Sequence, residues 1–364
     1  MSQRRGRIDN VLLFATMAIA VAGLFFLYSA TFEPGKSSYE IHNLVIRQCI
    51  WIGVGFLVLF SVAHMDYIRV LDFSYLAYFI NLLMLAYLLL FGGERYGAKR
   101  WIDVGFFSLQ PSEFVKITMI FALSTFLGQR RDRAGSLDNF IYAMLVVAPA
   151  FILIFLQPDL GTALILVPIL FAILLVSGEN IKYMIVTFLA GIASMPIAWH
   201  FLKGYQRNRL MVFINPNADP LGSGYTIIQS KIAIGSGGLT GKGWLNGTQN
   251  YLKFLPEKHT DFIFSTIGEE WGFIGALALV GLFSFVIARG VRIISETDDV
   301  YGKAIATGIV TLLSFQVLVN ISMTIGLMPV VGIPLPLISY GGSNVLATLI
   351  GIGLLLSVSR RRYR

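Results

Sequence analysis

The chain passes from a polar segment into an apolar one at Leu255-Pro256-Glu257-Lys258-His259-Thr260-Asp261-Phe262-Ile263-Phe264. The polar segment, residues 204–261, is mostly too hydrophilic to cross a bilayer, yet it interrupts a chain that is apolar almost everywhere else. Asp261 therefore stands at the mouth of a long apolar run. A carboxylate in that place is where we expect any chemistry to occur.

Composition identifies the class of protein. Of the 364 residues, 56% are hydrophobic and only 13% are charged, and the mean hydropathy is +0.73. Lipid is the main solvent of such a chain. A membrane-spanning helix needs about 20 mostly apolar residues. Ten segments qualify: 10–32, 44–64, 72–91, 111–128, 139–157, 159–177, 182–202, 263–289, 303–327 and 343–359. We expect an all-α polytopic membrane protein, a single domain over residues 1–364, with a long loop of about residues 204–262 between helices seven and eight.

Basic residues predict the orientation, because short cytoplasmic loops retain Lys and Arg. The first segment is preceded by Arg4, Arg5 and Arg7, and the last is followed by Arg360, Arg361, Arg362 and Arg364. Basic residues also follow segments four and eight (Arg130, Arg131, Arg133, Arg289, Arg292 and Lys303). Both termini should face the cytoplasm, and the polar segment should lie outside. The first segment lacks a clear cleavage site, so we expect it to be retained.

Several kinds of site are disfavoured. Cys49 is the only cysteine, which excludes an intramolecular disulfide and a cysteine metal cluster. The histidines, His42, His64, His200 and His259, have no second histidine at helical spacing, so no zinc site is predicted. The net charge of +8 follows the positive-inside pattern and contact with anionic lipid, and it carries no nucleic-acid signature.

The charges on the outer side are unusual. Residues 203–261 contain more basic than acidic residues. There are seven basic ones (Lys203, Arg207, Arg209, Lys231, Lys242, Lys253 and Lys258) and three acidic ones (Asp219, Glu257 and Asp261). The shorter outer loop after segment three adds Arg95, Lys99 and Arg100. A solvated loop is one explanation, since long translocated loops escape the positive-inside rule. The other is a binding site for an anion, and a lipid-linked phosphate is the natural anion at a membrane surface.

Other ionisable residues lie at or inside the apolar segments. They are Arg47, Glu113, Lys116, Asp159, Glu269 and Glu270. Because charge inside a bilayer costs about 2.5–3.5 kcal/mol at a helix centre, these side chains should face the bundle interior and form pairs. Glu113 and Lys116 are three residues apart and share a helix face. With Arg47, Asp159 and Asp261 they could converge on one cavity near the outer leaflet, or they could form a network that locks helices together.

Two glycine-rich stretches need an explanation. Residues 235–243 fail the phosphate-loop test, because Ser236 replaces the first glycine and Gly243 replaces the Ser or Thr that would hold magnesium. We expect a tight turn against a membrane-lying segment. Residues 338–344 follow an uncharged, proline-marked run, and their backbone amides could cradle a pyrophosphate. A helix cap that ends a re-entrant loop explains them equally well.

Together these residues resemble the SEDS family (shape, elongation, division and sporulation) over essentially the whole chain. The motifs that carry the resemblance are Gly97-Ala98-Lys99-Arg100-Trp101-Ile102, Gln110-Pro111-Ser112-Glu113, Gln157-Pro158-Asp159-Leu160-Gly161-Thr162, Pro220-Leu221-Gly222-Ser223-Gly224-Tyr225, Lys258-His259-Thr260-Asp261-Phe262-Ile263-Phe264 and Ile338-Ser339-Tyr340-Gly341-Gly342-Ser343. Gly241-Lys242-Gly243-Trp244 and the short amino-terminal tail resemble the elongation members more than the division members.

The resemblance implies a peptidoglycan glycosyltransferase that polymerises lipid II during cell elongation, on the outer face of the bacterial cytoplasmic membrane. It implies a class B penicillin-binding protein as partner, within the elongation machinery. The family's catalytic aspartate corresponds to Asp261. Residues expected to shape the cavity or to bind substrate are Glu113, Lys116, Asp159, Gln110, Ser343 and His259, and those expected to hold pyrophosphates are Arg47, Lys116, Arg100 and Lys258.

In such a reaction a sugar hydroxyl displaces undecaprenyl pyrophosphate from the growing glycan. Pyrophosphate is already a good leaving group, so one carboxylate base and a cationic cavity would suffice. Mg²⁺ or Mn²⁺ could bridge the pyrophosphate oxygens, but the sequence offers no dedicated ligand set. Two alternatives stay open, a lipid II flippase and a non-catalytic scaffold for the penicillin-binding protein.

Overall fold

The structure is a computed structural model, and it describes residues 8–32, 38–93, 100–103, 105, 108–220, 222, 224–252 and 254–361. Each of the ten predicted segments coincides with a helix: α1 (Asn10–Thr31), α2 (Ser38–His64), α4 (Ser74–Phe91), α5 (Pro111–Gln129), α6 (Leu137–Leu156), α7 (Leu160–Val176), α8 (Ile181–Phe201), α12 (Ile263–Ser295), α13 (Val300–Thr324) and α14 (Gly342–Arg361). Within the described residues, seven helices are long and apolar enough to cross a membrane, namely α1, α2, α4, α6, α12, α13 and α14. Two shorter apolar stretches are α7 and residues Ile181–Ile197 of α8.

The remaining elements are short. They are α3 (Tyr67–Leu71), η1 (Arg131–Arg133), and the strands β1 (Ile102–Asp103) and β2 (Ser108–Leu109), which pair antiparallel with Ile102 opposite Leu109. The polar segment contains α9 (Gly204–Ile214), η2 (Pro216–Ala218), α10 (Tyr225–Ser236) and α11 (Thr248–Tyr251). The polar segment is therefore not the plain loop that its composition suggested. Arg95, Lys99, Lys253 and the terminal arginines at 4, 5, 7, 362 and 364 lie outside the described residues.

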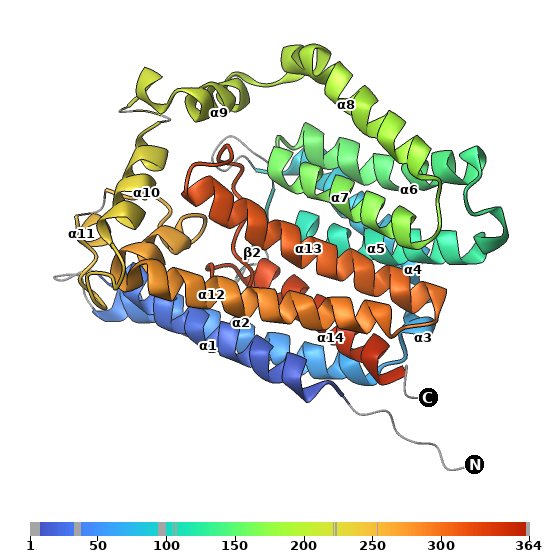
Figure 1. The fold of residues 1–364 in the computed structure, drawn as a ribbon, viewed down its shortest axis with the longest axis horizontal. Coiled ribbons are helices and arrows are strands. Elements are labelled where there is room, and N and C mark those ends of the chain that lie inside the picture. Colours follow the sequence, from blue (N-terminus) through green and yellow to red (C-terminus); the bar gives the residue numbers. More distant parts are fainter. Residues whose placement is uncertain are drawn as a thin grey trace.

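The long helices form one bundle (Figure 1). In it α2 packs along α14, α1 along α12, and α13 against both α7 and α12. Helices α13 and α14 are central, because 72% and 83% of the residues in their apolar stretches are buried. The corresponding share for α12 is 22%. Helix α8 runs along the edge of the molecule in Figure 1. Proteins in lipid bury the helix faces that pack together and leave apolar side chains on the rest.

Helix starts follow local capping chemistry. Six helices begin after an Asp, Asn or Ser whose side chain accepts a hydrogen bond from a backbone N–H of the first turn: Asp9, Asp66, Ser136, Asp159, Asn180 and Asp299. This satisfies donors that have no partner inside the helix. Two of these caps also tie helices together at the end of the bundle opposite Asp261. Arg289 on α12 pairs with Asp9 at 2.5 Å, and Arg361 on α14 pairs with Asp66 at 2.7 Å.

Helix α12 is broken at Gly272, whose φ of 61° and ψ of −159° are not helical. The glycine-rich stretch 237–243 fills the break. The N–H groups of residues 242 and 243 donate to the carbonyls of residues 269 and 270, each at 3.0 Å. The carbonyls of residues 238 and 239 accept from the N–H groups of residues 273 and 274, at 2.9 and 3.1 Å. The tight turn predicted here is confirmed, and it supplies partners that a break in an apolar helix requires.

A second irregular segment, residues 328–341, joins α13 to α14. It is not helical. From residue 333 onward it is largely buried, with exposed fractions of 0–3% at Ile333, Leu335, Leu337 and Ile338, whereas Met328 at its start is 38% exposed. Irregular backbone at membrane depth is tolerated where protein buries it. The segment lies directly against the turn that ends in Asp261.

Candidate active site

Asp261 ends a tight turn that begins at Glu257. The N–H groups of Thr260 and Phe262 donate to the Glu257 carbonyl, at 3.1 and 3.3 Å. Helix α12 starts at Ile263. The Asp261 side chain is partly buried. Its Oδ2 lies 3.4 Å from the position that a Cβ on Gly332 would occupy, so the carboxylate rests against the backbone of the segment 328–341.

Burial raises the pKa of Asp261 to about 6. Glu257 and Asp159 act in the same direction, while Arg209 and Arg100 lower the pKa. Since an ordinary aspartate has a pKa of about 3.9, Asp261 is a stronger base than most and is still mostly ionised at neutral pH. Those are the properties of a general base.

The two residues before Thr260 differ in character. Burial lowers the pKa of His259, which favours the neutral imidazole over the charged form. Its ring centroid lies 6.2 Å from that of Tyr340. Lys258 is also buried, with 9% of its surface exposed. Both candidates belong to the turn that ends in Asp261.

Glu113 and Lys116 form the pair that their spacing predicted. Lys116 Nζ lies 2.8 Å from Glu113 Oε1, and both side chains are almost fully buried, 2% and 3% exposed. Asn344 at the start of α14 donates to Glu113 Oε2 at 2.9 Å. The pair therefore joins α5 to α14, which fits the helix-locking interpretation and leaves the Lys116 ammonium already partnered.

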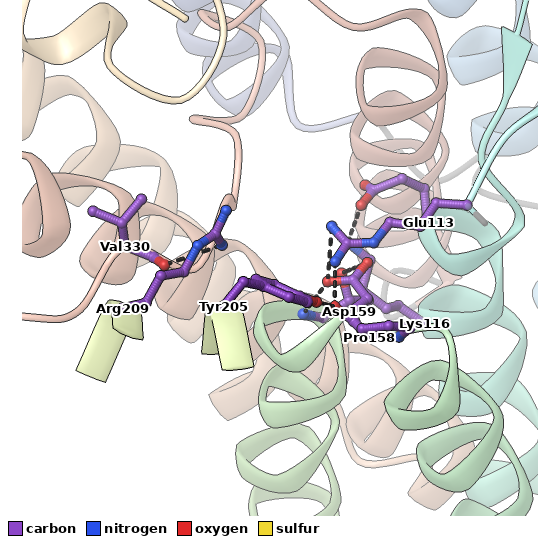
Figure 2. Close-up of polar contacts among 9 residues, drawn as sticks. Glu113, Lys116, Pro158, Asp159, Tyr205, Arg209 and Val330 are labelled. Carbon is purple, nitrogen blue, oxygen red and sulfur yellow. Dashed lines mark hydrogen bonds and ion pairs between the residues drawn. The ribbon is translucent and has the colours of Figure 1, made fainter. Parts of the chain in front are cut away.

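Asp159 is the N-cap of α7, as its position in the sequence predicted. Its oxygens accept from the backbone N–H and the hydroxyl of Thr162, at 3.2 and 3.0 Å. Arg100 Nη1 lies 3.8 Å from Asp159 Oδ1, and the guanidinium also donates to the Pro158 carbonyl. The Tyr205 hydroxyl on α9 donates to the same carbonyl at 2.8 Å. Figure 2 shows Tyr205 and Arg209 reaching from α9 toward the group of Glu113, Lys116 and Asp159.

A small pocket of about 30 Å³ opens beside this group. Its lining residues are Arg100, Pro158, Leu160, Tyr205, Gln206, Arg209, Leu210, Pro329, Val330 and Val331. Arg209 is positioned by a hydrogen bond to the Val330 carbonyl at 3.3 Å (Figure 2). From the sequence, Arg209 was identified only as one of the basic residues of the polar segment. Its helical register in α9, which was not anticipated, is what turns it toward Asp261.

Arg47 does not join the cluster. Its side chain is exposed on α2, where Nε donates to Asn43 Oδ1 at 3.0 Å. The expectation that it faces the bundle interior is wrong. The physical reason is that a long arginine can lie along an apolar helix surface and keep its charge in a polar layer.

Gln110 and Ser343 meet each other rather than Asp261. The Gln110 N–H donates to Ser343 Oγ at 3.0 Å, where α5 and α14 begin. Two neighbouring amides in the second glycine-rich stretch also have protein partners. Those of Tyr340 and Gly341 donate to the His259 carbonyl and to Gln48 Oε1. This favours the structural cap over the pyrophosphate cradle.

Glu269 and Glu270 are buried, as predicted for charges in an apolar segment, and Glu269 forms the ion pair that was expected while Glu270 is held by a serine hydroxyl. Lys242 Nζ lies 2.7 Å from Glu269 Oε1, and the Ser29 hydroxyl on α1 donates to Glu270 at 2.5–2.6 Å. Over the parts of the chain that the structure describes, no three His, Cys, Asp or Glu side chains gather in a way that could hold a metal ion.

Residues 10–364 match the family model of the FtsW/RodA/SpoVE cell cycle proteins. The chain belongs to the FtsW/RodA/SpoVE family. This confirms the resemblance to the SEDS proteins, which are the same family. Among curated members, the peptidoglycan glycosyltransferase MrdB of Escherichia coli K12 is 39% identical over 355 residues, which cover 97% of this chain and 95% of MrdB.

Solved FtsW/RodA/SpoVE structures agree with the fold. A chain from work on the structural coordination of polymerization and crosslinking by a peptidoglycan synthase complex superimposes with a TM-score of 0.83 at 35% identity, covering 98% of this chain and 99% of that one. The crystal structure of the rod shape determining protein RodA of Thermus thermophilus gives 0.73 at 30% identity, with 98% of each chain covered.

Proposed function

We propose that this protein is a peptidoglycan glycosyltransferase that polymerises lipid II into glycan strands, with Asp261 as the general base. One observation carries the chemical part of the proposal. A single carboxylate, with a pKa raised by burial to about 6, lies within electrostatic reach of two arginines, Arg100 and Arg209. The activity printed in the names of the relatives supports the same reaction class.

The reaction needs one proton transfer and one bond exchange. The 4-hydroxyl of a lipid II sugar attacks the anomeric carbon of the lipid-linked strand, and Asp261 takes the hydroxyl proton. The bond from that carbon to the pyrophosphate oxygen breaks, and the anomeric centre inverts. Because pyrophosphate leaves as a stable anion, no second carboxylate is required as an acid. General-base catalysis of this kind contributes about 10²–10⁴-fold to the rate.

The cations around Asp261 would stabilise the departing pyrophosphate. Arg100 and Arg209 share the pocket near Asp159, and Lys258 precedes Asp261 by three residues. Preorganised cations in a water-poor site stabilise developing charge better than water does. Glu113 and Lys116 would shape the cavity from behind as a locked pair, and exposed Arg47 would contact a lipid phosphate at the bilayer surface.

We further propose a single domain with ten membrane-spanning helices, both termini in the cytoplasm and residues 204–262 outside the cytoplasmic membrane. The ten helices and the arginine-rich end of the bundle, at Arg289, Arg360 and Arg361, support this topology. A class B penicillin-binding protein of the elongation machinery is the proposed partner. The synthase complex containing a similar chain supports that partner class.

The test uses the purified full-length protein in detergent with labelled lipid II. The wild type should form glycan strands, and Asp261→Asn should form none while remaining folded at the assay temperature. Asp132→Asn, which removes an exposed carboxylate from η1, is the matched control and should polymerise normally. Detergent offers no two membrane sides, so a flippase or a scaffold would give no strands even as wild type. Normal polymerisation by Asp261→Asn would refute the general-base role.

A further inference from the structure

The backbone of the turn that presents Asp261 is held at three consecutive carbonyls. The His259 carbonyl accepts from the Tyr340 N–H at 2.9 Å. The Thr260 carbonyl accepts from the Ser339 hydroxyl at 2.6 Å. The Asp261 carbonyl accepts from Asn320 Nδ2 at 3.0 Å. All three donors belong to α13 or to the buried segment that follows it.

Asn320 joins the two parts of this arrangement. Its Nδ2 also donates to the Ile333 carbonyl at 2.8 Å, so both amide hydrogens are used. The residue is 0% exposed, and its Oδ1 is buried without a hydrogen-bond partner among the residues that the structure describes. An Asn has two donors on one nitrogen, and here the two donors alone explain a polar residue in an apolar core. The Asp261 backbone is thereby fixed relative to residues 331–333, the backbone against which the carboxylate rests.

Gln48 braces the same assembly from α2. Its Nε2 donates to the Ser339 carbonyl at 3.1 Å, and its Oε1 accepts from the Gly341 N–H at 3.2 Å. The side chain is 1% exposed. It therefore clamps the backbone on both sides of Tyr340, whose N–H in turn holds His259.

We propose that Asn320 and Gln48 are positioning residues for the glycosyl transfer, acting on the base through the backbone of residues 259–261. The proposal rests on the function proposed above for Asp261. Neither side chain needs to touch the substrate. A displacement of about 1 Å at a catalytic group can lower a rate by about 10²-fold, so a brace on the turn is a requirement of the chemistry.

We expect the brace also to limit how much water reaches the carboxylate. The charged groups that act on Asp261 are Glu257 in its own turn, Asp159 at the start of α7, Arg100 before β1 and Arg209 on α9. The hydrogen bonds of Asn320 and Gln48 described above all run to backbone groups and not to these charged side chains, so loosening the turn leaves those charges in place. Added hydration should then move the pKa of Asp261 down toward that of an ordinary aspartate.

The experiment compares three substitutions in the full-length protein in detergent, each assayed with lipid II across a range of pH. Asn320→Leu keeps the volume and removes both donors. Gln48→Met keeps the length and removes the outer clamp. Asn139→Leu is the control, because Asn139 is equally buried, at 1% exposed, and donates to Glu179 away from the Asp261 turn.

For Asn320→Leu we expect kcat per folded molecule to fall about 10²-fold, with KM for lipid II unchanged and the acid limb of the rate profile moved to lower pH. Gln48→Met should show the same pattern with a smaller loss, and it carries the test if Asn320→Leu does not fold. Asn139→Leu should lower thermal stability while leaving kcat and the acid limb unchanged.

Two results would overturn the proposal. One is that both test variants keep the wild-type kcat and acid limb. The other is that their activity falls only in proportion to the folded fraction, with the acid limb unmoved, as a purely structural role requires. Polymerisation by Asp261→Asn would instead overturn the general-base function of Asp261. That result comes from a separate variant, so it is distinguishable from a failure of the positioning proposal.

Discussion

Acidification should slow polymerisation about tenfold between pH 7.5 and pH 5, because Asp261 must be ionised to accept a proton. With a pKa of about 6, the carboxylate is about 97% ionised near pH 7.5 and about 9% ionised near pH 5. An ordinary aspartate would still be about 90% ionised at about pH 5. The ionised fractions in these two cases differ enough for any strand-length or label-incorporation assay to distinguish the resulting rates.

The assay measures initial rates with saturating labelled lipid II in detergent at half-unit steps of pH. A sample held at pH 5 and returned to pH 7.5 should recover its full rate. Protonation of Asp261 does not unfold the protein, so unfolding caused by this group cannot produce the same loss of rate at low pH. A carboxyl whose pKa is raised in the folded state stabilises the fold below the unfolded pKa, near 3.8, and that stability is lost as the pH rises through about 6. Acidification thus favours the native state at this group while it removes the base.

A rate that stays flat from pH 7.5 to pH 5 would refute the argument. It would mean either that Asp261 is hydrated like a surface aspartate or that proton transfer to it does not limit the rate. Measuring Asp261→Glu in the same series separates these cases, because a longer carboxylate changes the burial and should move the acid limb if Asp261 sets it.

Three further outcomes follow from the structure. Asp261→Asn should raise the free energy of unfolding at pH 7.5 by an amount on the order of 1–3 kcal/mol, seen as a higher thermal unfolding temperature, and the gain should shrink toward pH 4. Lys116→Ala should lower the free energy of unfolding by about 3–5 kcal/mol, since Glu113 would remain buried and unpaired, and in denaturation assays Lys116→Glu should be partly rescued by Glu113→Lys. Gly241→Ala should destabilise the protein and expose residues 237–243 to limited proteolysis, because Gly241 has a φ of +81° and a Cβ there would lie 2.1 Å from the Glu270 carbonyl.

Each outcome has a clear contrary result. An unchanged unfolding temperature in Asp261→Asn would show that the carboxylate carries no burial penalty. Failure of the Glu113→Lys rescue would show that the charge pairing of residues 113 and 116 does not stabilise the fold. Normal stability and proteolysis in Gly241→Ala would mean that the turn does not need its positive φ.

The sequence predicted the helices well because lipid leaves the backbone few choices. A bilayer requires long apolar segments whose hydrogen bonds are internal, and each of the ten apolar segments found in the sequence coincides with a helix. Local chemistry was equally legible. The spacing of Glu113 and Lys116 predicted their pair, and the place of Asp159 after a proline predicted a helix start.

Contacts between residues far apart in the sequence could not be predicted in the same way. Asn320 is a neutral amide in an apolar helix, and nothing in its neighbours indicates that it reaches Asp261, 59 residues away. Arg209 turns toward the site only because residues 204–214 form a helix within a segment that reads as a polar loop. Arg47 was misplaced because the cost of burying a charge says that it needs a polar environment, and does not say on which side of its helix.

The break at Gly272 bears on how the protein fits its bilayer. Helix α12 has 33 residues, more than the roughly 20 that a membrane requires, so it must tilt or bend as bilayer thickness changes. The part before the break is tied to residues 237–249 and to Ser29 through Glu269 and Glu270. The part after the break is free of those bonds beyond its first turn. A change in tilt can therefore be absorbed at the glycine, and Asp261 keeps its surroundings in membranes of different thickness.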